Sequence, residues 1–187
     1  MTNRYFDKLE QATGGREKSI RWFRDKIRDF GTPPPLQLVN EGEVRPYPYW
    51  GRMNFFLYDA KYKDKLPYWD RFPLVLPLEE TNNGFIGLNF HYLSIPMRLK
   101  LLNIITDFAT DRRFDEDTRI NTTYRQLKRH PIVKPTIKRY LNSKLDSPFR
   151  RINVDEMMMA VLLPIQQFQK QSETKVYSDS RRMMARR

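Results

Sequence analysis

The chain has 187 residues, of which 40% are hydrophobic and 13% aromatic, and its formal net charge is +12. This composition predicts one domain with a sizeable core, and it excludes a wholly disordered chain. The absence of cysteine excludes disulfides and thiolate zinc sites, and no apolar run approaches the roughly 18 residues that cross a bilayer. We therefore expect no membrane partner. We also expect the protein to reside in a reducing compartment, or in a particle that is assembled in such a compartment.

Apolar residues at helical spacing predict a helix that follows Gly14-Gly15 and runs to about Phe30. Its apolar side is expected to consist of Ile20, Phe23, Ile27 and Phe30. Gly31 and the prolines at 33–35 should end this helix, because proline cannot continue the hydrogen-bond ladder. An extended stretch containing Pro46 and Pro48 then leads to the next segment.

Three alternating segments predict consecutive antiparallel strands over residues 52–58, 72–78 and 85–92. Asn83-Gly84 favours a type I′ hairpin turn between the last two. Pro73 and Pro77 lack the N–H groups along one flank, which predicts an edge or a bulge. Residues 59–71 should form a solvent-facing loop that ends in two aromatic residues, Tyr68 and Trp69.

The second half of the chain predicts mainly helices. Ser94 should cap a helix that covers the sheet through the stripe Ile95, Leu99, Leu102, Ile105 and Phe108. We then expect a charged turn over 111–117, short helices near 122–129 and 135–144, one or two helical turns over 155–160, and a strand over 161–168 returning to the sheet. The polar, basic stretch from Ser172 would be disordered if it stood alone.

These elements predict an α+β fold, in which a small curved antiparallel sheet or partly open barrel is covered by helices. We divide the chain into an N-terminal helix and proline-rich arm (1–50), a core domain (51–171) and a basic C-terminal tail (172–187).

The sequence offers little for catalysis or metal binding. Only two histidines occur, His91 and His130, and a hydrogen-bonded, half-buried imidazole is the simpler interpretation of His91. Asp155 with Glu173-Thr174-Lys175 faintly resembles a magnesium nuclease pattern, but Glu173 stands in the polar tail rather than on a strand. Asp59, Asp64 and Asp70 alternate with basic residues that can neutralise them. We therefore predict no enzyme, no metal and no cofactor.

The positive charge is concentrated late in the chain. Residues 119–151 carry ten Lys or Arg and one acid, and residues 175–187 carry five and one, so the remainder is nearly neutral. Such a block can bind a phosphate backbone without reading base sequence, or it can face acidic protein neighbours. The candidate contact residues are Arg125, Lys128, Arg129, Lys134, Lys138, Arg139, Lys144, Arg150 and Arg151, and the tail that could insert between partners carries Arg181, Arg182, Arg186 and Arg187.

Several stretches of this sequence resemble virion proteins of T-even-type contractile-tailed bacteriophages, which are described as DNA end protectors or virion structural proteins. The runs 53–78 and 83–93 carry the resemblance, with further matches at Lys134–Leu141 and Leu163–Lys170. The resemblance covers roughly residues 50 to 180.

The resemblance implies a virion component, made in the host cytoplasm, that sits beside other virion proteins where the packaged genome ends. It would bind and shield the ends of double-stranded DNA without catalysis. The alternative is an architectural neck or baseplate subunit of the tail that acts through protein contacts only. A nuclease is a third and remote hypothesis.

Overall fold

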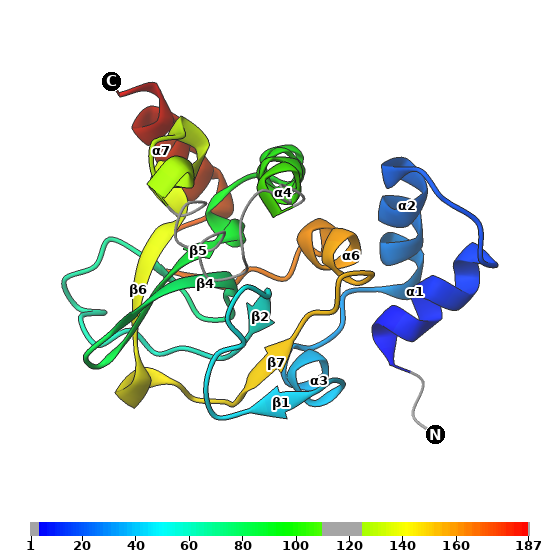
Figure 1. Cartoon of the computed structure of the whole chain (residues 1–187), viewed down its shortest axis with the longest axis horizontal. Helices are drawn as coiled ribbons and strands as arrows, with labels where there is room; N and C mark the ends of the chain where they lie inside the picture. Colours follow the sequence, from blue (N-terminus) through cyan, green and yellow to red (C-terminus); the bar gives the residue numbers. More distant parts are fainter. Residues whose placement is uncertain (1–3, 110–124, 187) are drawn as a thin grey trace.

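An open, six-stranded antiparallel sheet forms the centre of the computed structural model, which describes residues 4–109 and 125–186 (Figure 1). The order of the strands is β1-β7-β2-β4-β5-β6, and a separate pair is formed by β3 and β8. The strands are β1 (Val44–Arg45), β2 (Asn54–Phe55), β3 (Trp69–Asp70), β4 (Leu74–Thr81), β5 (Gly84–Asn89), β6 (Ile137–Leu141), β7 (Phe149–Arg151) and β8 (Phe168–Gln169). Because β1 and β6 are the two edges, the sheet does not close into a barrel, and the predicted α+β class is confirmed.

Helices surround this sheet, with α1 and α2 at one end of the molecule and α7 at the opposite end (Figure 1). They are α1 (Tyr5–Thr13), α2 (Ile20–Phe30), α3 (Pro35–Asn40), α4 (Ile95–Ala109), α6 (Met157–Leu162) and α7 (Glu173–Ala185), with 3-10 turns η1 (Phe90–Tyr92), η2 (Pro131–Thr136) and η3 (Asn142–Lys144). One core takes Leu9 from α1, Leu38 from α3, Leu74 from β4 and Val161 from α6. Helices from both halves of the described chain thus share one core with the sheet.

The two faces of the sheet bury different residues. Met53 and Phe55 belong to the main core, whereas Phe56 and Tyr58 belong to a second, aromatic cluster with Phe85, Tyr140 and Phe149. This is the alternation that the sequence predicts for residues 52–58. Regular pairing is shorter than predicted, because only Asn54 and Phe55 pair with β4 and β7.

Two predictions for the second half of the chain are wrong. Residues 135–144 were expected to be helical, but Ile137–Leu141 form edge strand β6, because pairing with β5 brings the Tyr140 ring into the aromatic cluster. Residues 161–168 were expected to be one strand, but Val161 and Leu162 finish α6, and only Phe168 continues into β8. β8 pairs with β3, outside the main sheet.

The structure also contains helices that the sequence did not predict. No helix is predicted for residues 5–13, but they form α1, whose Tyr5, Phe6 and Leu9 are buried. Pro35 was expected to prolong an extended arm but opens α3, where the first helical position needs no N–H donor. In α2, the ends of the expected apolar side are exposed, and only Ile27 is buried.

The basic tail is an ordered helix. The hydroxyl of Ser172 accepts a hydrogen bond from the Lys175 N–H and caps α7, and the Ser180 hydroxyl donates to the carbonyl of Tyr92 at 2.7 Å. α7 packs against η1 and η2, so the tail expected to be disordered alone is held by the core. The predicted turn at 111–117, residues 122–124, Arg119 and Arg187 lie outside the described residues, as does the side chain of Phe108.

Gly84 serves a different purpose from the one expected. The hairpin turn consists of Asn82 and Asn83, because Thr81 already pairs with Gly84, and none of these residues has a positive φ. The predicted type I′ turn is therefore wrong. Glycine is required because a Cβ at position 84 would lie 1.9 Å from the carbonyl oxygen of Tyr140 on β6.

We predict that Gly84→Ala separates β5 from β6 and lowers the free energy of unfolding by about 1–3 kcal/mol, the usual cost of overpacking. Urea denaturation followed by circular dichroism measures this loss. The neighbouring exposed substitution Asn83→Ala should stay within about 0.5 kcal/mol of the parent protein. An unchanged stability in Gly84→Ala would contradict the close approach of the two strands.

Candidate nucleic-acid interface

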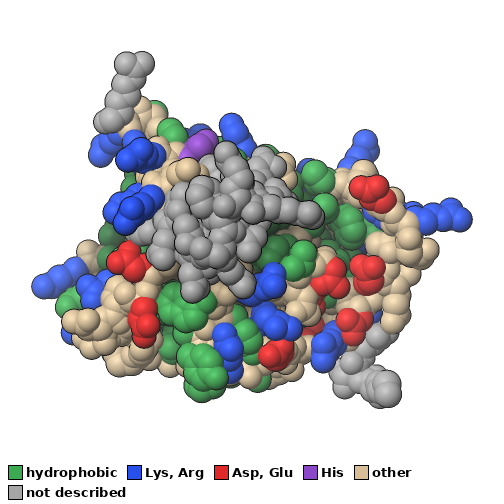
Figure 2. All heavy atoms as spheres, viewed as in Figure 1, with side chains coloured by type: hydrophobic (Ala, Val, Ile, Leu, Met, Phe, Trp, Pro, Cys, Tyr) green, Lys and Arg blue, Asp and Glu red, His purple; other side chains and the backbone are tan. Residues whose placement is uncertain are grey.

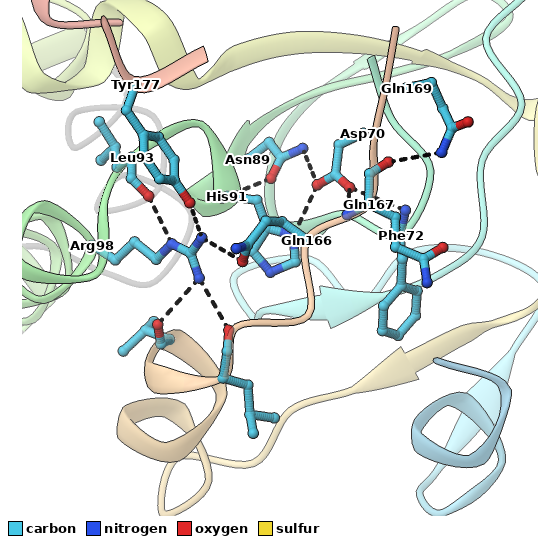
Figure 3. A network of polar contacts seen from close by, with 12 residues as sticks. Asp70, Phe72, Asn89, His91, Leu93, Arg98, Gln166, Gln167, Gln169 and Tyr177 are labelled. Carbon is cyan, nitrogen blue, oxygen red and sulfur yellow. Dashed lines mark hydrogen bonds and ion pairs between the residues drawn. The ribbon is translucent and has the colours of Figure 1, made fainter. Parts of the chain in front are cut away.

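A buried carboxylate, Asp70 on β3, organises the polar interior (Figure 3). Its oxygens accept hydrogen bonds from the backbone N–H groups of Phe72 and Gln167, from the Asn89 amide, and from His91 Nδ1 at 2.8 Å. Burial alone would raise the pKa of Asp70, but the interactions with His91, Gln167 and Asn89 outweigh it and hold that pKa below its usual value. Asp70 is therefore ionised and joins β3 to η1 and to the segment before β8.

Arg98 on α4 is the second centre of this network and is fully buried (Figure 3). Its guanidinium donates to the carbonyls of Leu93 and Leu163 at 2.8 and 3.1 Å, to Gln166 Oε1 at 2.8 Å, and to the Tyr177 hydroxyl at 3.1 Å. Arg98 thus links α4 to the residues that follow α6 and to α7. Because Tyr177 lies on α7, the position of the basic tail depends on this side chain.

The pair Asp70–His91 resembles part of a catalytic site, but neither side chain reaches solvent. Burial lowers the pKa of His91 even beside Asp70, so the imidazole is neutral at pH 7 and donates its Nδ1 proton to the carboxylate. His91 is hydrogen-bonded as expected and more deeply buried than expected. Among the residues that the structure describes, no three acidic or histidine side chains are grouped to hold a metal ion.

The faint nuclease pattern is dispersed in the fold. Glu173 lies in the first turn of α7, Lys175 pairs with Asp179 on the same helix at 2.8 Å, and Asp155 is exposed in the turn before α6. Glu173, Lys175 and Asp155 are all exposed, so the pattern does not form a shared site.

We predict that Arg98→Met lowers the free energy of unfolding by about 3 kcal/mol or more, since each buried carbonyl left without a donor costs about 1–3 kcal/mol. Thermal and urea unfolding measure the loss. Lys100→Met, which removes an exposed cation from the same helix, is the matched control and should have little effect. Equal stability of the two variants would show that Arg98 does not hold these elements together.

The residues of the predicted basic block do not form one surface. Arg150 on β7 is fully buried, stacks over the Phe6 ring and pairs with Glu156 at 3.0 Å. Arg151 pairs at 2.7 Å with Glu43, which directly precedes the edge strand β1. Burial places Arg150 out of reach of any external ligand, so the last part of the block serves the sheet.

A second group of cations gathers where η2 meets α7, and we call this region the basic end. Lys134 Nζ donates to the carbonyl of Arg186 at 2.6 Å and so brings the two segments together. Figure 2 shows Lys and Arg side chains clustered at the end of the molecule where α7 lies. The basic end comprises Arg125, Lys128, Arg129, Lys134, Arg181, Arg182 and Arg186.

Most side chains of the basic end are available to a partner. Arg125, Arg129 and Arg181 are exposed and form no ion pair with any residue that the structure describes. Arg182 is paired with Asp179 at 2.6 Å and remains largely exposed. The exposed cations of the basic end thus come from the 125–129 segment and from the tail.

An open groove of about 870 Å³ lies next to the basic end, between the loop that precedes β3 and the edge strand β6. Its walls are aromatic, with Tyr62, Tyr68 and Trp69 on the loop side and Tyr92 beneath Lys138. Lys61, Lys138 and Arg139 contribute positive charge, and Lys144 follows the groove on η3. The sequence indicated the aromatic end of the loop, but it did not indicate that β6 would face it.

Lys170 fixes the wall of this groove. Its ammonium donates to the carbonyls of Lys63, Asp64 and Leu66, and it is the one non-glycine residue with positive φ in the part of the chain described. The charge of Lys170 thus satisfies backbone carbonyls of the loop at 60–66. The sequence predicts that acidic and basic residues of the 59–71 loop neutralise one another. Among the described residues, one such ion pair lies within the loop, between Lys63 and Asp59 at 2.8 Å.

Lys138 is the cation of the groove most affected by its surroundings. Its Nζ lies 3.9 Å from the centre of the Tyr92 ring, and burial lowers the pKa of Lys138 to about 8. In the unfolded chain the ordinary lysine pKa is about 10.4, so above about pH 8 the unfolded state binds more protons than the folded state. The Lys138 contribution to stability therefore becomes more favourable as pH rises from about 8 towards 10.4.

We predict that the free energy of unfolding of the parent protein, measured relative to Lys138→Met, rises as pH is raised above about 8. Both proteins contain the same tyrosines. Subtracting the free energy of unfolding of Lys138→Met from that of the parent protein therefore removes the contribution of tyrosine ionisation. Urea denaturation over a pH series supplies the measurement. A difference that stays constant with pH would mean that Lys138 titrates at its ordinary value.

Together these features define a class: an α+β protein that carries a basic end and an adjoining aromatic groove. The chain matches the family model described as Phage T4 terminal DNA protecting protein over residues 5–186. It belongs to this family of phage proteins, and the predicted resemblance is confirmed. None of the curated proteins and none of the solved structures matches it. In the described residues, no helix has the length and apolar character of a membrane span.

Proposed function

We propose that this protein binds and shields the ends of linear double-stranded DNA in the phage particle, without catalysis, through its basic end. The observation that carries the proposal is the match over residues 5–186 to a family described as terminal DNA protecting. The exposed cations at 125–129 and on α7 supply the charge that such binding needs. Covering a DNA end sterically requires no chemical step, so shielding follows from binding alone.

The basic end suits contact with phosphates rather than with base edges. Its exposed side chains are arginines and lysines spread over two segments, with Asp179 already paired to Lys175 and Arg182. Such contacts release counterions, so affinity falls steeply with salt and depends little on sequence. The chain would act beside other virion proteins, since a protein that covers a DNA end inside a particle has neighbours there.

We predict that Arg129→Ala with Arg181→Ala weakens binding to linear duplex and makes the plot of log affinity against log salt shallower by nearly 2, about 0.9 for each lost phosphate contact. Filter binding over a salt series measures both effects. The matched control removes two exposed arginines at the other end of the molecule, Arg21→Ala with Arg24→Ala on α2, and should leave the slope unchanged.

End shielding is tested by comparing linear with circular duplex and by adding an exonuclease that digests from ends. The parent protein should prefer the linear form and slow digestion, and the basic-end variant should lose both properties. Equal binding of the two forms, or no binding, would contradict the proposal and favour the architectural role in the neck or baseplate. Degradation of DNA by the protein with magnesium, lost in Glu173→Gln, would contradict the absence of catalysis.

A further inference from the structure

Phosphate contacts alone do not distinguish a DNA end from the middle of a duplex, because the backbone charge is the same in both. An end differs in that its terminal nucleotides can leave the stack and expose the faces of their bases. A surface for an unstacked base beside the phosphate contacts would therefore give a preference for ends. The described surface contains one candidate, the aromatic groove between residues 58–69 and β6.

The groove has the composition of a stacking site. Tyr62 is 56% exposed, and the partly exposed residues Tyr68 and Trp69 line the same wall. Aromatic faces bind bases of any sequence, because every base has a π face. A volume of about 870 Å³ also lies in the range of about 300–1,000 Å³ that is usual for small-ligand sites.

The charge of the groove favours a nucleic acid over a peptide. Lys61 lies 5.2 Å from the Tyr62 ring, and β6 carries Lys138 and Arg139 along its free edge. Lysine and arginine on an edge strand oppose the addition of a further strand, whereas they attract a phosphate backbone. The Tyr58 hydroxyl also accepts the Leu141 N–H at 3.2 Å, so one donor of this edge is already occupied.

The groove is continuous with the basic end. Burial and the nearby Asp179 carboxylate on α7 raise the pKa of Tyr68, and the carbonyl of Tyr92 accepts the Ser180 hydroxyl of the same helix. β6 begins directly after η2, which carries Lys134. One DNA strand can therefore pass from the cations of α7 and η2 to the aromatic wall without leaving the surface.

We propose that this groove binds an unpaired terminal nucleotide of DNA, with its base stacked on Tyr62 and Trp69 and its phosphate beside Lys138 or Arg139. The proposal rests on the DNA-end binding proposed above and assigns the recognition of the end itself. Lys170 has a positioning role, because it holds the carbonyls of the loop that carries Tyr62.

The test uses one duplex in two forms: closed by hairpin loops at both ends, or bearing short single-stranded overhangs. Tyr62→Ala should lower the affinity for the overhang form about fivefold to a hundredfold, the range for loss of a base–aromatic stack, and leave the closed form unchanged. Tyr62→Phe keeps the ring and should retain binding. Lys170→Ala, which frees the loop, should reduce overhang affinity in the same direction.

Tyr47→Ala is a closely matched control. Tyr47 is 58% exposed and has a cation, Arg45, at 4.6 Å from its ring, but it lies beside β1 at the opposite edge of the sheet. It should bind both duplex forms like the parent protein. The inference is overturned if Tyr62→Ala binds the overhang form normally, or if it weakens both forms equally, even where the parent protein still prefers ends.

A direct measurement separates this inference from the proposed function. A short single-stranded oligonucleotide should change the tryptophan fluorescence of the parent protein, and Trp69→Phe should remove the change while Trp22 and Trp50 remain. If the protein binds neither duplex form but shows this response, end shielding fails and the groove site stands. The absence of any fluorescence response would overturn the proposed nucleotide site. Binding of extended peptides but not of the oligonucleotide would also overturn it.

Discussion

The buried guanidinium of Arg98 is the contact on which the position of α7 depends. It joins α4, the carbonyl of Leu163 after α6, and Tyr177 of α7, three segments that share no other common partner in this network (Figure 3). Burial lowers the pKa of Arg98, yet the guanidinium remains charged because its ordinary value is so high. A charged group in this position is stable only if its donors are satisfied, so the surrounding carbonyls and hydroxyl are fixed in place.

This network explains why the basic tail is ordered. α7 has a narrow buried stripe, in which Val176 and Ser180 are buried and Met184 is half-buried, and a stripe of this kind would not hold a short helix in water by itself. Polar docking through Ser180 and Tyr177 completes its attachment. The partners of α7 include Tyr92, Arg98 and η2, all far away in sequence, so the local composition of the tail predicts disorder when it is read alone.

The sequence was informative where a pattern is local and was misleading where pairing is distant. The alternation of Phe55 and Phe56 predicts the two faces of the sheet, and the cap at Ser94 predicts α4, because both signals lie within a few residues. The segment at 137–141 gave no comparable signal, since its strand character comes from pairing with β5 and from burial of Tyr140. The groove was unpredictable for the same reason, because that strand forms one of its walls.

The density of basic residues along the sequence indicated the region of the basic end. It did not distinguish Arg129, which is exposed, from Arg150, which is buried against Glu156.

The attachment of α7 also bears on how tightly a polyanion can be held. Cations on a disordered tail must be ordered when they bind, at about 0.5–1.5 kcal/mol for each immobilised side chain and with further backbone entropy lost. Arg181 and Arg182 extend from a helix that is already docked, so the backbone part of that cost is met when the protein folds. Asp179 of the same helix lies near Tyr68 at the groove, so the proposed phosphate site and the proposed base site are held at a fixed spacing. A rigid spacing of this kind allows one surface to favour the end of a strand over its interior, because both contacts can form together only where a terminal base is free to enter.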